Sequence, residues 1–125
     1  MDYTEAARSA SRELGSDDGD ELAQAALQLA LQAWRSLSGD DPAWDRFGLE
    51  LLDVRDRLYP TTTVTTVTAP LYCDGLEIRQ MVAELVETLA ARHRRVAGDE
   101  DRPLAERLDH DGAAVQLRRA AATLI

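Results

Sequence analysis

The sequence predicts an all-α fold, an antiparallel four-helix bundle with an additional C-terminal helical segment. Alanine and leucine, both strong helix formers, dominate the composition. Apolar residues recur at three- and four-residue spacing along most of the chain, and glycine or proline interrupts that spacing at only a few points. Because 125 residues suffice for one domain but not for two, we expect a single helical domain over residues 1–125.

The first predicted helix spans residues 3–14. A stripe at helical spacing contains its apolar side chains: Tyr3, Ala7, Ala10 and Leu14. Because small residues make up half of this stripe, the helix can approach its neighbours closely. Gly15 follows, and we expect it to end the helix in a left-handed conformation.

The second predicted helix runs to Leu37 and begins at a capping-box spacing, with Asp18 three residues before Glu21. Its polar side chains form one narrow stripe: Gln24, Gln28, Gln32 and Arg35. Apolar side chains cover most of the remaining circumference. Such a helix is either central in its domain or packs on a second subunit as well.

The third predicted helix begins with Asp41 as its N-cap and Pro42 at its first position, and it ends before Pro60. Alternating three- and four-residue spacing indicates a buried stripe of Trp44, Phe47, Leu51, Val54 and Leu58. The side chains that we expect to be largely buried in the whole chain are Trp34, Trp44, Phe47, Leu51, Val54, Leu85 and Leu89.

Residues 60–70 contain six threonines and two valines between two prolines. Because β-branched threonines and flanking prolines oppose helix formation, we expect a non-helical connection, either a strand or a loop. We also expect Val64 and Val67 to contact a neighbouring chain or the end of the bundle, since no charged residue protects this segment from association.

The fourth predicted helix starts after a second capping-box pair, Asp74 and Glu77, and runs to about Ala97. Its expected buried stripe comprises Ile78, Met81, Val82, Leu85, Leu89 and Val96. Residues 103–125 form either one helix or two short helices divided at Gly112.

The acidic composition excludes several classes of function. The chain has 23 acidic and 14 basic residues, and its net charge is −9. This balance argues against binding to nucleic acid or to an anionic membrane surface. One cysteine permits neither an internal disulfide nor a zinc site built from several thiolates. The N-terminal residues lack the pattern of a signal peptide, so we expect a cytoplasmic protein.

Two carboxylate doublets are the sharpest candidates for catalysis. Asp53-x-x-Asp56 lies on the third predicted helix, and Glu84-x-x-Glu87 lies on the fourth. Doublets on neighbouring helices can hold Mg²⁺, which prefers oxygen ligands. Over residues 53–87 the chain resembles the all-α nucleotide pyrophosphatases of the MazG type, although that family favours Glu-Glu first and Glu-Asp second. The resemblance implies an Mg²⁺-dependent pyrophosphohydrolase with these four residues as metal ligands.

Helical geometry favours a different interpretation of the doublets. At about 100° per residue, Asp53 and Asp56 lie nearly opposite the apolar stripe of their helix, and the same holds for Glu84 and Glu87. A metal cage between helices requires them to face inward. We therefore expect a solvated face, with Asp53 paired with Arg57.

Three further motifs have ordinary structural explanations. The cluster Arg92-His93-Arg94-Arg95 could bind a phosphate, but cations at a helix end also complement the helix dipole, and His93 is expected to be partly buried. The Asp109-His110-Asp111 motif is interpreted as a turn with Asp111 as a helix cap. Cys73, without a base nearby in sequence, is expected to be half-buried and inert.

No catalytic set passes the geometric test, so we expect a non-enzymatic protein-interaction module without a cofactor. The apolar second helix and the threonine-rich segment favour a homo-oligomer, with a dimer as the preferred form. Three alternatives remain open. They are the Mg²⁺-dependent hydrolase, an inhibitor or immunity-type protein that binds a basic partner through its negative charge, and a ligand-binding bundle, which requires an internal cavity.

Overall fold

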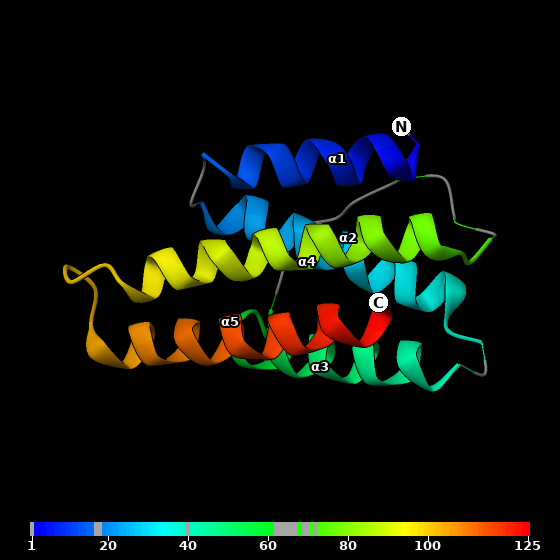
Figure 1. Cartoon of the computed structure of the whole chain (residues 1–125). Helices are drawn as coiled ribbons and strands as arrows, with labels where there is room; N and C mark the ends of the chain where they lie inside the picture. Colours follow the sequence, from blue (N-terminus) through cyan, green and yellow to red (C-terminus); the bar gives the residue numbers. More distant parts are fainter. Residues whose placement is uncertain (1, 17–18, 40, 62–67, 69–70, 72) are drawn as a thin grey trace.

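The computed structural model describes residues 2–16, 19–39, 41–61, 68, 71 and 73–125. Within these residues the chain forms helices and no strand (Figure 1). The helices are α1 (Tyr3–Leu14), α2 (Asp20–Leu37), α3 (Pro42–Leu58), α4 (Leu76–Ala97) and α5 (Leu104–Leu124). The prediction of an all-α fold is confirmed.

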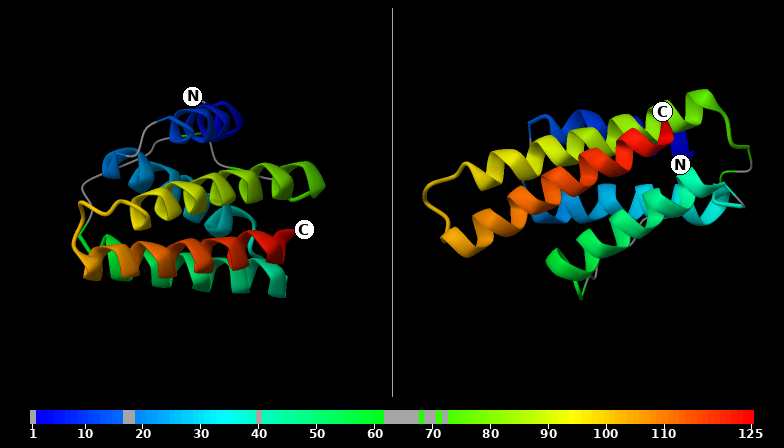
Figure 2. Two further views of the ribbon diagram at one scale, coloured as in Figure 1. Left: turned by 60° about the vertical axis from the view of Figure 1, so that its left-hand side comes forward. Right: turned by 60° about the horizontal axis from the view of Figure 1, so that its bottom comes forward.

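The helices stack in three layers (Figure 1). α1 covers one side of α2 and α4, and α3 and α5 lie together on the other side. α4 and α5 lie side by side in opposite directions, whereas α1 and α4 run in the same direction (Figures 1 and 2). This packing is compatible with a bundle, and the parallel pair departs from a wholly antiparallel arrangement.

The C-terminal segment is one continuous helix, α5, with Gly112 in its interior. The expectation of a helix cap at Asp111 is therefore wrong. A glycine inside a helix costs only about 1 kcal/mol, and burial of the apolar side chains around it offsets that cost. α5 packs along both α3 and α4, so it is an integral part of the core rather than an addition to it.

α2 lies inside the bundle, where it packs against α1, α3 and α4. Its apolar circumference is thus covered within the chain, and it supplies no argument for a second subunit. The Tyr3 hydroxyl donates a 2.6 Å hydrogen bond to the Leu29 carbonyl oxygen, which ties the start of α1 to α2.

The buried apolar residues of the described chain form one cluster to which all five helices contribute. Trp44 and Phe47 meet edge to face with ring centroids 5.4 Å apart. Every side chain predicted to be largely buried is buried except Trp34, which is half-buried. The ring of Trp34 lies directly over Gly48 of α3, where a Cβ atom would come within 2.2 Å of it. A glycine therefore sets the separation of α2 and α3.

Of the predicted helix caps, the one at Asp41 is confirmed. The Asp41 carboxylate accepts a hydrogen bond from the Ala43 amide, as expected. Gly19 and Gly75 are the N-caps of α2 and α4, where no side-chain cap forms. The capping box predicted at Asp74 and Glu77 is therefore wrong, whereas Asp18 of the other predicted box lies outside the described residues. Gly15 has φ −64°, so it is not left-handed.

Most of the threonine-rich segment, including Val64 and Val67, lies outside the described residues, and its predicted contacts stay predictions. Thr68 accepts a 2.6 Å hydrogen bond from the Gln32 side chain, and Leu71 packs against the core. None of the helices in the described ranges is long and apolar enough to cross a membrane.

Candidate functional site

A cluster of polar side chains, built around three buried ones, lies at one end of the molecule. Arg92 and His93 of α4 are fully buried, and His110 of α5 is 8% exposed. Asp20 at the start of α2 and Tyr59 after α3 complete the group. We call these five residues the polar cluster.

Helical periodicity explains why the polar cluster is internal. Arg92 continues the spacing of Leu85, Leu89 and Val96, so it occupies the centre of the buried stripe of α4. His110 precedes Ala114, Leu117 and Ala121 at the same alternating spacing. The spacing of Arg92 with the apolar stripe of α4 is visible in the sequence. The four consecutive basic residues nevertheless favoured the interpretation of a solvated helix end.

The interpretation of the basic motif holds for only half of it. Arg94 and Arg95 are exposed on the last turn of α4, whereas Arg92 and His93 point into the protein. His93 is more deeply buried than expected. His110, interpreted as part of a turn, lies inside a helix and faces His93.

The buried guanidinium of Arg92 has partners from three directions. One Nη atom donates to Asp20 Oδ1 at 2.7 Å, and the other lies 3.3 Å from both the Tyr59 hydroxyl and His93 Nδ1. Such partners are necessary because an unpaired buried charge is strongly destabilising. Arg92 therefore connects α2, α4 and the end of α3.

The two histidines of the chain stack on each other. Their ring centroids are 5.0 Å apart, and the two Nδ1 atoms lie 2.8 Å apart. A guanidinium can only donate, so His93 Nδ1 accepts from Arg92 and cannot carry a proton. The bridging proton then belongs to His110 Nδ1. The network thus assigns one tautomer to each ring.

Burial and positive charge keep both rings neutral. Burial, together with the charge of Arg92, lowers the pKa of His93 to about 3. The same two causes lower the pKa of His110. Burial raises the pKa of Tyr59, so its hydroxyl keeps its proton. At neutral pH Arg92 is the cation at the centre of neutral acceptors and one carboxylate.

A cleft of about 240 Å³ opens on this cluster. Side chains from α2, the end of α3, the α4–α5 turn and the first turns of α5 line it: Asp20, Arg57, Leu58, Tyr59, Arg102, Glu106, Asp109 and His110. His110 thus has its Nδ1 edge in the interior and reaches the cleft as well. None of the sequence-based site predictions assembled this group.

The acidic doublet of α3 is solvated. Asp53 and Asp56 are exposed, and Asp53 lies 3.6 Å from Arg57 Nε, which is the predicted pairing. Asp53 also accepts a hydrogen bond from Gln116 of α5, and Asp56 pairs with Arg55 at 3.2 Å. These carboxylates therefore face α5 and solvent.

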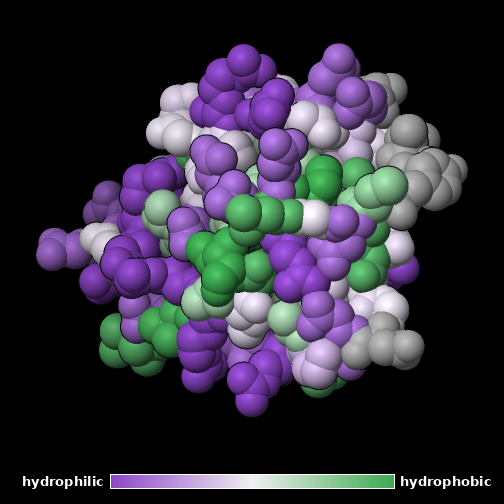
Figure 3. All heavy atoms as spheres, turned by 45° about the vertical axis from the view of Figure 1, so that its right-hand side comes forward, coloured by the Kyte–Doolittle hydropathy of each residue, from purple (hydrophilic) through white to green (hydrophobic). Residues whose placement is uncertain are grey.

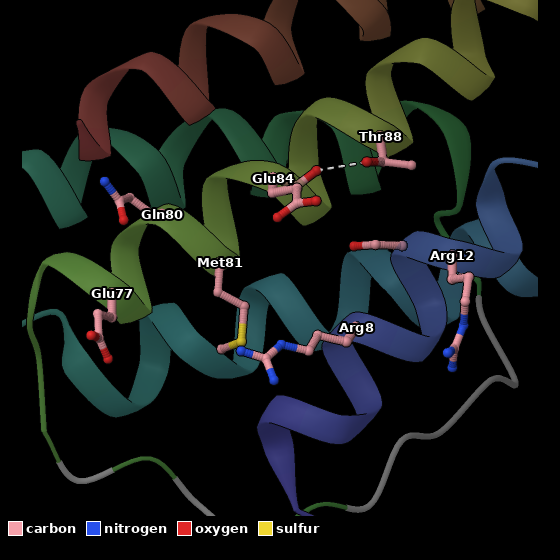
Figure 4. Close-up of a pocket in the computed structure, with 8 residues that line it drawn as sticks. Arg8, Arg12, Glu77, Gln80, Met81, Glu84 and Thr88 are labelled. Carbon is pink, nitrogen blue, oxygen red and sulfur yellow. Dashed lines mark hydrogen bonds between the residues drawn. The ribbon is translucent and has the colours of Figure 1, made fainter.

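The acidic doublet of α4 is divided between two grooves. Glu84 lies in a groove of about 530 Å³ between α1 and α4, shown in Figure 4 with Arg8 and Arg12 on the α1 side. Glu87 lines the surface between α4 and α5 instead. Thr88 donates to the carbonyl oxygen of Glu84, a contact within the helix.

The structure does not bring the two doublets together. α3 packs on α2 and α5, and α4 packs on α1, α2 and α5. The bodies of α3 and α4 are not adjacent, although the Arg79 side chain at the start of α4 reaches the Trp44 ring of α3. Over the described ranges, no group of three or more His, Cys, Asp or Glu side chains is arranged to hold a metal ion. The arrangement implied by the MazG resemblance is not formed.

A second polar group lies at the opposite end of α4. Arg79 bridges Asp41 and Asp74, and Trp44 Nε1 donates to Asp74 at 3.1 Å. The hydrogen bonds from Arg79 lower the pKa of both carboxyl groups. We call this group the Arg79 staple. Cys73 beside it is exposed, so the expectation of a half-buried thiol is wrong.

The outer face of α5 carries large apolar side chains. Leu104, Leu108 and Val115 are 66%, 61% and 48% exposed, and their spacing places them on one stripe of the helix. α3 and α4 cover the other side of α5, and in the left view of Figure 2 α5 lies at the lower side of the molecule together with α3. Figure 3 shows hydrophobic side chains bordered by hydrophilic ones in another view of the surface.

Comparison with known protein families, with curated proteins and with solved structures finds no match for this chain. The functional interpretation therefore depends on the geometry above. Two features offer unused binding capacity: the outer face of α5 and the cleft beside the polar cluster.

Proposed function

We propose that this protein is a small acidic helical interaction module, non-enzymatic and cytoplasmic, that forms a dimer through the outer face of α5. The observation that carries the proposal is the exposed stripe of Leu104, Leu108 and Val115. Exposed apolar stripes of this kind mark protein-interaction sites. The bundle architecture leaves this stripe uncovered because the opposite face of α5 fills the core.

The occupant is a second copy because the stripe is self-complementary. Asp111 and Arg118 complete the same alternating three- and four-residue spacing. In an antiparallel pair of α5 helices centred near Val115, Asp111 lies opposite Arg118 of the partner subunit, and the two-fold axis repeats the contact. The exposed Ile125 then lies near Leu104 of the partner subunit.

The groove beside α5 can extend the contact. Val115, Arg118 and Ala122 line a hollow of about 380 Å³ together with Glu87 and Arg94 of α4. A pair of single helices buries less than the roughly 1,200 Å² of a stable interface, so we expect a dimer that dissociates on dilution. The predicted contact through Val64 and Val67 would add to this area.

Sedimentation or light scattering over a concentration series tests the proposal. Asp111→Arg and Arg118→Asp should each give a monomer, and the double variant should restore the dimer because the pairing is reversed. Leu108→Asp should also give a monomer. Leu49→Asp is the matched control, since Leu49 is 66% exposed on α3 and should leave the mass unchanged.

Two results would overturn the proposal. One is a monomer at every accessible concentration of the parent protein, which would favour the inhibitor-type alternative with a basic partner. The other is a dimer that persists in all of the α5 variants, which would place the interface elsewhere.

A further inference from the structure

One imidazole nitrogen at the cleft beside the polar cluster has no protein partner. His110 Nδ1 donates its proton to His93, so the neutral ring has a free lone pair on Nε2. No described residue hydrogen-bonds to Nε2 of His110. The atom is accessible from the cleft that His110 lines. The side chain as a whole is only 8% exposed.

The remaining charged groups of the cleft are the carboxylates of Asp20, Glu106 and Asp109 and the guanidinium groups of Arg57 and Arg102. Arg57 is engaged by Asp53 and Gln116, and Arg102 lies 3.6 Å from Asp99. Glu106 and Asp109 make no hydrogen bond or ion pair with any described residue. Because the two arginines have acidic partners, the uncompensated charge of the cleft is negative.

The three free acceptors share one face of α5. Glu106, Asp109 and His110 stand at positions i, i+3 and i+4, which are neighbours on a helix surface. All three line the same cleft. We propose that this cleft binds a small organic cation with a primary ammonium group, whose N–H donors reach His110 Nε2 and the carboxylates of Glu106 and Asp109.

The chemistry of the site selects an ammonium over other ligands. An ammonium has three donors and no acceptor. It therefore matches the three acceptors of the site that no protein group occupies. A carboxylate or phosphate would meet two like charges. The tautomer set by Arg92 matters because a proton on Nε2 would turn the acceptor into a donor; Arg92 and His93 are thus positioning residues for His110.

Proton NMR of the two histidines tests this site directly, because the chain contains only two. The probe is n-butylammonium chloride, and sodium butyrate at equal ionic strength is the matched anion. We expect the His110 Hε1 signal, assigned with His110→Gln, to shift saturably with the amine and not with butyrate. Glu106→Gln should weaken the amine roughly threefold to tenfold, as for one exposed charge-assisted hydrogen bond.

Controls separate this site from the α5 dimer. Glu5→Gln removes an exposed carboxylate on α1 and should leave the affinity unchanged. The titration should give the same affinity in Leu108→Asp, whatever the oligomeric state. A saturable shift with butyrate, tighter binding of Zn²⁺ than of the amine, or no saturable shift with the amine would each overturn the assignment.

Discussion

The two ends of α4 each hold an arginine that bridges separate segments of the chain, but the two environments differ. Arg79 has a side chain that is 20% exposed and joins two carboxylates from two connections. Arg92 is fully buried and joins one carboxylate, a phenol and an imidazole. The comparison shows how burial changes what the same side chain does.

At the Arg79 staple, the charge acts on groups that solvent already stabilises. Asp41 caps α3 and Asp74 precedes α4, so Arg79 fixes the relative position of two helix starts. Arg79 also lies 5.6 Å above the Trp44 ring. In the polar cluster, by contrast, the charge of Arg92 acts across the interior and decides which imidazole nitrogen holds a proton.

The largest effect is expected in the apolar layer beneath the Arg79 staple. Trp44→Ala should lower the free energy of unfolding by about 3–5 kcal/mol, because a buried aromatic leaves a cavity and the Asp74 hydrogen bond is lost. Urea denaturation measures this change. Leu49→Ala, on the exposed side of α3, should change it by less than about 0.5 kcal/mol. Equal effects would contradict the assigned burial of α3.

The second effect concerns the buried arginine itself. Arg92→Met should cost about 3 kcal/mol, since it removes the partner of Asp20 and leaves Tyr59 and His93 without their donor. Arg94→Met on the exposed side of the same turn is the control and should be nearly neutral. A neutral Arg92→Met would show that the polar cluster repacks without its cation.

The third prediction distinguishes the two ends of α4 by how each makes the free energy of unfolding depend on pH. The pKa of His93 is about 3 in the folded protein, and its ordinary value is 6.5. Below pH 6.5 the unfolded chain therefore binds a proton at His93 that the folded chain does not bind. The free energy of unfolding should therefore fall by about 2 kcal/mol between pH 6.5 and pH 4.5. The contribution of His110, whose pKa is also lowered, has the same sign.

The Arg79 staple should not make the free energy of unfolding depend on pH between pH 6.5 and pH 4.5. Lowered carboxyl pKa values make Asp41 and Asp74 stabilising above 3.8, and this stabilisation is lost only as the pH falls below that value. Denaturation at several pH values, repeated with His93→Gln, measures the difference. The variant should have the shallower slope between pH 6.5 and pH 4.5, and an unchanged slope would contradict the neutral buried histidine.

The smallest effect is expected for the exposed arginine. Arg79→Met should cost at most about 1 kcal/mol, because solvent screens both ion pairs and the released carboxylates become hydrated. Added salt should weaken the parent protein and leave the variant less affected. A cost that matches that of Arg92→Met would remove the distinction between the two ends.

The sequence predicted the helices well because their periodicity is a local property. The ranges of α1 and α3, the cap at Asp41 and the buried stripe from Trp44 to Val54 all follow from spacing alone. The cap at Gly75 was missed because Asp74, the predicted cap, has a stronger partner in Arg79, a residue beyond the capping turn. Local rules do not include such tertiary competition.

The candidate site was less accessible to sequence reasoning. The spacing of Arg92 with Leu89 and Val96 placed it in the core, but only the fold shows that Asp20 and Tyr59 arrive to pair with it. The position of His110 facing His93 likewise depends on how α4 and α5 turn back on each other. The outward orientation of the acidic doublets followed from helical angles, which are a local property.

The contact of Trp34 with Gly48 has an evolutionary consequence. Any substitution at position 48 places a side chain inside the indole ring, so the two positions should vary together in homologous chains. A residue larger than glycine at position 48 should accompany a smaller residue at position 34. A lineage that changes position 48 first passes through an overcrowded intermediate, whereas one that changes position 34 first does not. The order in which such a lineage accepts its mutations is thus constrained: position 34 changes first.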